Sequence, residues 1–144
     1  MSRGIFSLVV IAMLFVGGSH VLAQARPPVI AEKAAIGQPS GLFDVSASGT
    51  FTLVNPEATK LECRVEVKWR KQDGTFVPDA AHGTGRAVIA GRAKGEFAGT
   101  KPGSNPPDNT AVPMVRVSIW GSAKPGAAVT RLTPFTDWQT MPRQ

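Results

Sequence analysis

Cys63 and His82 are the two side chains best suited to nucleophilic chemistry, as the thiolate and the base of a possible pair. The chain contains one cysteine and two histidines, and the other histidine, His20, lies within the first 25 residues. Cys63 stands between Leu61 and Val65, where apolar and charged residues alternate, so its thiol belongs to the apolar face. His82 lies in a glycine-rich segment with no neighbour that would orient its ring. The pattern therefore predicts a buried structural thiol and not a catalytic pair.

Other site chemistries lack their sequence requirements. A tetrahedral zinc site needs more clustered ligands than one cysteine and one histidine provide, and calcium needs more carboxylates than Asp108 alone. The glycines between residues 82 and 95 lack the lysine and serine of a phosphate-binding loop, and the pattern Gly-x-Ser-x-Gly does not occur. Glu62 and Glu66 alternate with basic residues, which is typical of cross-strand ion pairs. We therefore expect no enzymatic activity, no metal and no cofactor.

The residues with the best potential for binding are aromatic, basic or turn-forming. Trp120 falls in the outward register of its expected strand, as does Arg116 on the same strand. Residues 99–113 form the longest irregular stretch and are expected to be an exposed loop. Exposed tryptophan beside basic residues is typical of sugar-binding and protein-binding surfaces. The predicted binding residues are Trp120, Arg116, Lys101, Asn105, Asp108 and Asn109.

These residues must be positioned by strands, and the clearest strand is residues 61–70. Its odd positions are all apolar and its even positions are all charged, which predicts one buried and one solvated face. Cys63 and Trp69 fall on the buried face. Val115, Val117 and Ile119 alternate in the same way, and their segment is expected to cover the apolar face of the first strand.

Further strands are expected at residues 42–54, 75–77, 86–97 and 129–135, with a tight turn at Asp73-Gly74 and a bulge or bend near Gly91 and Gly95. Residues 26–41 are expected to be a flexible leader with a short edge strand near Val29, or with a short helix over 30–36. Residues 136–144 form a tail whose Trp138 packs on one end. About seven strands predict an all-β, immunoglobulin-like or fibronectin-like antiparallel β-sandwich over residues 42–135.

Two short segments resemble strands of immunoglobulin domains. Leu-Glu-Cys at 61–63 is similar to the strand that carries the first cysteine, and residues 67–74 are similar to the strand that carries the core tryptophan. In that family the two features lie on different strands and a second cysteine follows. Here they share one strand, and the resemblance covers about a tenth of the chain. It implies the sandwich architecture and no family membership.

Residues 1–25 have the order of a secretory signal peptide. Arg3 precedes an apolar run over residues 5–16, and small residues follow near Ala23 and Ala25. We expect cleavage after Ala25, with Ala23 as the close alternative and an uncleaved anchor as the less favoured one. No cysteine closely follows the run to accept a lipid anchor. The expected location is therefore secreted or periplasmic, with membrane contact only through the transient signal peptide.

The chain is basic, with 16 Lys and Arg against 10 Asp and Glu. Removal of residues 1–25 takes Arg3 and no acid, so the formal net charge falls from +6 to +5. A positive surface attracts polyanions, and export disfavours nucleic acid. We expect a non-catalytic domain that binds an envelope or extracellular protein or an acidic glycan. The alternatives are an accessory subunit of a surface assembly that pairs through an edge strand and, less favoured, a hydrolase on a β scaffold.

Overall fold

The computed structural model describes residues 25–144, and this part of the chain is all-β. Most of the predicted signal peptide lies outside the described residues. In residues 25–144 there is no helix with the length and apolarity needed to cross a membrane. The strands are β1 (Val29–Gly37), β2 (Phe43–Thr52), β3 (Thr59–Arg70), β4 (Phe76–Pro78), β5 (Gly83–Gly91), β6 (Lys94–Ser104), β7 (Val112–Ser122), β8 (Val129–Arg131) and β9 (Gln139–Thr140).

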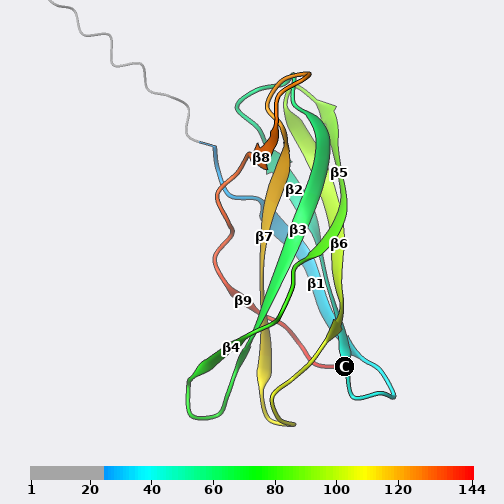
Figure 1. Cartoon of the computed structure of the whole chain (residues 1–144), viewed down its shortest axis with the longest axis vertical. Coiled ribbons are helices and arrows are strands. Elements are labelled where there is room, and N and C mark those ends of the chain that lie inside the picture. Colours follow the sequence, from blue (N-terminus) through cyan, green and yellow to red (C-terminus); the bar gives the residue numbers. More distant parts are fainter. Residues whose placement is uncertain (1–24) are drawn as a thin grey trace, which may run out of the picture.

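The strands form one antiparallel sheet that curls into a half-barrel (Figure 1). Its order is β1-β2-β6-β5-β3-β7-β8, with β4 added to β3 and β9 added to β7. The all-β prediction is confirmed. The division into two packed sheets, as in an immunoglobulin-like sandwich, is not confirmed, because the nine strands of residues 25–144 are hydrogen-bonded into a single sheet.

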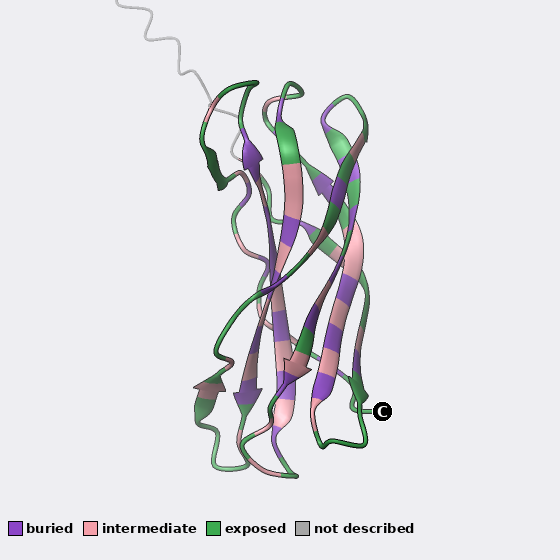
Figure 2. Cartoon of the chain, turned by 45° about the vertical axis from the view of Figure 1, so that its right-hand side comes forward, coloured by how far each residue is buried: buried purple, intermediate pink, exposed green. Residues whose placement is uncertain are grey.

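β3 is the long strand expected from the alternation. Cys63, Val65 and Trp69 are fully buried, while the even positions from Glu62 to Lys68 are only partly buried and face outward. Buried and partly buried residues alternate in this way along the long strands of the sheet (Figure 2). β7 pairs with β3 along most of its length, with Val65 opposite Val117. The expectation that β7 covers the apolar face of β3 is therefore wrong, because β7 is hydrogen-bonded to the edge of β3. The two strands are neighbours, and the curl of the sheet supplies the cover.

The curl depends on residues without side chains at the fold between β5 and β6. A Cβ at Gly85 would lie 2.0 Å from the carbonyl oxygen of Ala98, so only glycine permits this approach. One strand further, a Cβ at Gly99 would lie 2.5 Å from the Sγ of Cys63. This close packing brings β6 against β3 although β5 lies between them in the sheet.

The C-terminal segment closes the lower end of the half-barrel (Figure 1). β9 pairs with β7, and the chain then crosses to β1, where Ala35 donates its N–H to the carbonyl of Pro142 at 3.3 Å. Between these contacts Met141 is 2% exposed and joins the core. Residues far apart in sequence therefore bridge the two sides of the curled sheet.

Along one edge of β7, threonine hydroxyls accept hydrogen bonds that the backbone carbonyls of a neighbouring strand would otherwise accept. Val117 donates its N–H to the Oγ1 of Thr136, and Ile119 donates to the Oγ1 of Thr133, both at 3.0 Å. β8 therefore ends at Arg131, and the strand expected over residues 129–135 is three residues long. The residues that follow lie along β7 as an irregular segment.

Three other boundaries differ from the sequence expectations. Residues 29–37 form a nine-residue strand, where a leader with a short strand or helix was expected, because alanines obscure its alternation. β5 begins at Gly83, inside the expected linker. β6 continues to Ser104, so the irregular stretch expected over 99–113 is reduced to 105–111. Pro102 is accommodated at a shift of register between β2 and β6.

Candidate functional site

The outer face of β3 and β7 carries alternating cations and aromatic rings. The even positions of β3 point outward, and the β3–β4 hairpin and the C-terminal segment add rings beside them. We call this surface the cation–aromatic face. It consists of Phe76, Lys68, Trp138, Arg116, Phe135 and Arg131.

Lys68 occupies one end of this face between two rings. Its Nζ lies 3.9 Å from the ring centroid of Phe76 and 4.4 Å from that of Trp138. Within residues 25–144 no carboxylate forms an ion pair with Lys68. Cation–π contacts hold an ammonium group in place while its N–H donors stay available. Lys68 is therefore a positioned cation without a counter-ion among the described residues.

Arg116 occupies the middle of the cation–aromatic face. Its Cζ lies 3.9 Å from the ring centroid of Phe135 and 4.7 Å from that of Trp138. Its Nε donates to Glu66, the residue opposite on β3, at 2.6 Å. Arg131 also lies over Phe135, at 4.6 Å. The rings and cations thus form one continuous row across β4, β3, β7, β8 and the C-terminal segment.

Trp120 extends the same face beyond the row. The Cζ of Arg64 lies 3.7 Å from its ring centroid, and its Nε1 donates to the Oγ of Ser118 at 2.9 Å. Trp120 stands opposite Glu62 on β3 and Arg131 on β8. The outward register predicted for Trp120 is confirmed, and the ring is half-buried under the guanidinium group.

A pocket of about 440 Å³ opens beside Lys68, and we call it the Trp138 pocket. Its lining includes Glu66, Lys68, Phe76, Asp79, His82 and Trp138. Two rings and the chain turning into β5 bound it, and Arg116 reaches its edge. Its volume falls within the range of about 300–1,000 Å³ that is common for small-ligand sites.

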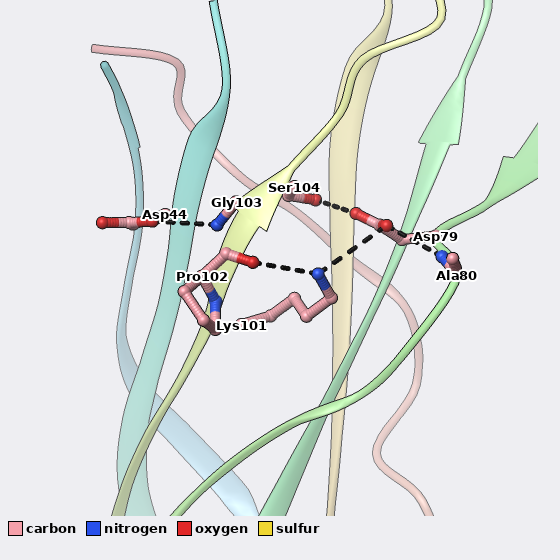
Figure 3. A network of polar contacts seen from close by, with 7 residues as sticks. All are labelled: Asp44, Asp79, Ala80, Lys101, Pro102, Gly103 and Ser104. Atoms are coloured by element: carbon pink, nitrogen blue, oxygen red, sulfur yellow. Dashed lines mark hydrogen bonds and ion pairs between the residues drawn. The ribbon is translucent and has the colours of Figure 1, made fainter. Parts of the chain in front are cut away.

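Asp79, which lines this pocket, also belongs to a polar network (Figure 3). The side chain of Asp79 is 9% exposed, and its carboxylate lies 3.8 Å from the Nζ of Lys101. Ser104 donates its hydroxyl to the same carboxylate, as does the N–H of Ala80 at 2.8 Å. Lys101 also donates to the carbonyl of Pro102 at 2.9 Å. These contacts fix the turn between β4 and β5 against the end of β6.

The prediction that Lys101 lies in an exposed loop is therefore wrong. The residue lies in β6, faces inward and is 8% exposed, because β6 runs past Pro102 to Ser104. Its ammonium group is used inside the molecule to accompany the carboxylate of Asp79. A buried ion pair of this kind fixes a conformation more than it offers a binding surface.

Asn105, Asp108 and Asn109 lie in the loop between β6 and β7, where none of them lines the Trp138 pocket. Asp108 accepts hydrogen bonds from the hydroxyl and N–H of Thr110, and these bonds lower the pKa of its carboxyl. The carbonyl of Asn109 accepts from Arg143 at 2.6 Å. Of the six predicted binding residues, Arg116 and Trp120 share one face, while Lys101 and the three loop residues lie elsewhere.

Cys63 and His82 are placed in different environments. Cys63 is fully buried in the middle of β3, and burial raises the pKa of its thiol from 9.0 to about 11. His82 is exposed just before β5 and lines the Trp138 pocket. The structure does not bring the two side chains together as a nucleophile and its base. In residues 25–144 no group of three His, Cys, Asp or Glu residues is placed to hold a metal ion.

The raised pKa of Cys63 predicts a loss of stability at alkaline pH. The thiol is the favoured form in the fold, so its contribution is complete below the unfolded pKa of 9.0 and is lost as pH rises towards the folded value of about 11. Between these pH values, we expect the free energy of unfolding to fall more steeply for the native protein than for Cys63→Ala. Urea denaturation at a series of pH values measures the difference, and parallel curves would contradict it.

The amino-acid sequence did not identify Lys68, Phe76, Phe135 and Trp138 as members of one surface. The outward register of Lys68 was readable from the alternation. The positions of the rings were not readable from the alternation, because Phe135 and Trp138 reach this face only through the irregular pairing of the C-terminal segment with β7.

Comparison with known protein families and with curated proteins finds no match to this chain. The arrangement of its own residues therefore carries the functional argument.

Proposed function

We propose that this protein is an exported, non-catalytic binding module that contacts an envelope or extracellular partner through the cation–aromatic face. The observation that carries the proposal is the continuous row of rings and cations on the outer face of β3 and β7. Large rings held by packing lose little conformational entropy on binding, and they dominate the energy of many interfaces.

Two features distinguish this row from an ordinary solvated surface. Phe76 is 49% exposed, so its ring can still lose contact with water when a partner binds. The only ion pair of Arg116 within the described residues uses its Nε, which leaves the other guanidinium nitrogens for a partner. The row thus offers apolar area and directed N–H donors together.

Export remains part of the proposal and is supported by the order of residues in the first 25 positions.

The alternative of a structural subunit that pairs through an edge strand receives less support. The edge strand β1 carries a register shift between Ile30 and Glu32 in its pairing with β2, and Lys33 follows. Bulges and lysines are typical of edges that resist pairing with another chain.

Capture from the native envelope and extracellular fractions tests the proposed function. Trp138→Ala and Phe76→Ala are expected to retain at most about a tenth of the material that the native protein captures, since each removes a hot-spot ring. Val88→Ala is the matched control, because Val88 is an exposed apolar residue on β5 outside this face. Equal capture by all four proteins, or no capture by the native protein, would contradict the proposal.

A further inference from the structure

The Trp138 pocket combines the three features that recognition of a charged sugar requires. Lys68 supplies a cation with no carboxylate partner in the described part of the chain. Trp138 and Phe76 flank its ammonium group and supply flat apolar surfaces. The carboxylate of Glu66 provides acceptors for hydroxyl groups at the edge of the same pocket. A pyranose ring has an apolar C–H face and a rim of hydroxyls, so it matches this arrangement.

The charge balance of the pocket favours a negative ligand. Glu66 is paired with Arg116 at 2.6 Å, and Asp79 lies 3.8 Å from Lys101 and is hydrogen-bonded by Ser104. Each of the two carboxylates that line the pocket thus has its own basic partner. Within residues 25–144, the charge of Lys68 is not balanced by an ion pair, and a ligand anion can neutralise it.

We infer that the Trp138 pocket binds an anionic pyranose residue of an acidic polysaccharide, with Lys68 on the negative group and Trp138 against the sugar ring. The inference rests on the proposed binding function and names its ligand class. Arg116 at the edge of the pocket and Arg131 beyond it continue the row, so further anionic residues of the same polysaccharide can meet cations along it. A carboxylate or a sulfate ester meets the same requirement at Lys68.

Calorimetric titration of the full-length mature protein with defined oligosaccharides tests this assignment. The probes are hexamers of galacturonate, of a sulfated galactan and of neutral galactan, with polyglutamate of equal charge as an anion without sugar. We expect at least one of the two acidic hexamers to bind. Neutral galactan and polyglutamate should bind more weakly than that hexamer or not detectably. The two acidic arms show which negative group is preferred, and preference for either one supports the inference.

Two variants separate the roles of charge and ring. Lys68→Ser is expected to weaken binding about five- to tenfold and to reduce its dependence on salt, whereas Trp138→Ala weakens binding at least tenfold and leaves the salt dependence unchanged. Lys94→Ser, which removes the same charge from exposed Lys94 on β6, should behave as the native protein does. Trp138→Phe, which keeps a ring, should bind more tightly than Trp138→Ala. This recovery would show that the loss in Trp138→Ala does not come from misfolding alone.

Equal binding of polyglutamate and the acidic hexamers would overturn the inference, because it would show attraction by charge alone. Binding that Lys68→Ser and Lys94→Ser weaken equally would do the same. If no oligosaccharide binds while capture from native fractions still depends on Trp138, the sugar assignment fails and the proposed binding function stands. If capture is also independent of Trp138, both fail.

Discussion

Replacing Gly85 by alanine is expected to lower the free energy of unfolding by about 3–4 kcal/mol, near the upper end of single-substitution effects. The added Cβ would lie 2.0 Å from the carbonyl oxygen of Ala98 and 2.3 Å from the Cα of Gly99. Both are backbone atoms of β6, so neither can rotate away as a side chain does. The sheet would have to open where it folds, and the contacts of β6 with β3 would be lost. Chemical denaturation measures the change.

Gly99 supplies the matched control, because the obstacle to its Cβ is a side chain. That Cβ would lie 2.5 Å from the Sγ of Cys63 and 3.0 Å from a methyl group of Val65. Overpacking of this kind costs about 1–3 kcal/mol. Cys63→Ala should relieve much of the cost of Gly99→Ala and none of the cost of Gly85→Ala. If Cys63→Ala reduced the destabilisation by Gly99→Ala and by Gly85→Ala equally, the cost of Gly85→Ala would not come from contact with the backbone of β6.

Replacing Asp79 by alanine is expected to destabilise the fold by about 3 kcal/mol, the lower end of the range for breaking a buried ion pair. Lys101 would be left with the carbonyl of Pro102 as its remaining partner, and the hydroxyl of Ser104 would lose its acceptor. Because Asp79 lines the Trp138 pocket, the same variant should also weaken ligand binding. Denaturation and titration of one preparation measure both effects.

Removing the buried charge should reverse most of that destabilisation. Asp79→Ala combined with Lys101→Met leaves no unpaired ammonium group, and a nonpolar chain of similar length fills the space. Asp137→Ala is the control, because Asp137 is exposed and its loss should change stability by less than about 0.5 kcal/mol. A double variant no more stable than Asp79→Ala would mean that the loss comes from the turn itself and not from the unpaired charge.

The sequence predicted the structure best where apolar and polar residues alternate along a strand, because the alternation shows which face of the strand is buried. The burial of Cys63 and Trp69 and the outward register of Trp120 followed from alternation alone. The turn at Asp73-Gly74 followed from turn chemistry, since Gly74 has a φ of 85°. These features depend on neighbours within a few residues.

What could not be predicted depends on contacts between distant residues. β1 and the end of β6 owe their extended form to pairing with β2, and their own sequences carry alanines, a proline and glycines. The burial of Lys101 requires Asp79, which stands 22 positions earlier in the chain. The cation–aromatic face likewise forms only when residues 132–140 lie along β7. Alternation gave the outward positions on β3, and tertiary structure gave the rings beside them.

The three tryptophans allow the central claim, that the outer face of β3 and β7 is the binding surface, to be tested in one measurement. Trp138 lies in the proposed site, Trp120 lies further along the same face, and Trp69 is fully buried on the opposite side of β3. Their indole N–H resonances can be followed in ¹H–¹⁵N spectra during titration with the acidic hexamer that binds. We expect a large, saturable shift of the Trp138 resonance, a smaller shift for Trp120 and none for Trp69. Saturable binding that leaves the Trp138 resonance unmoved would contradict the central claim.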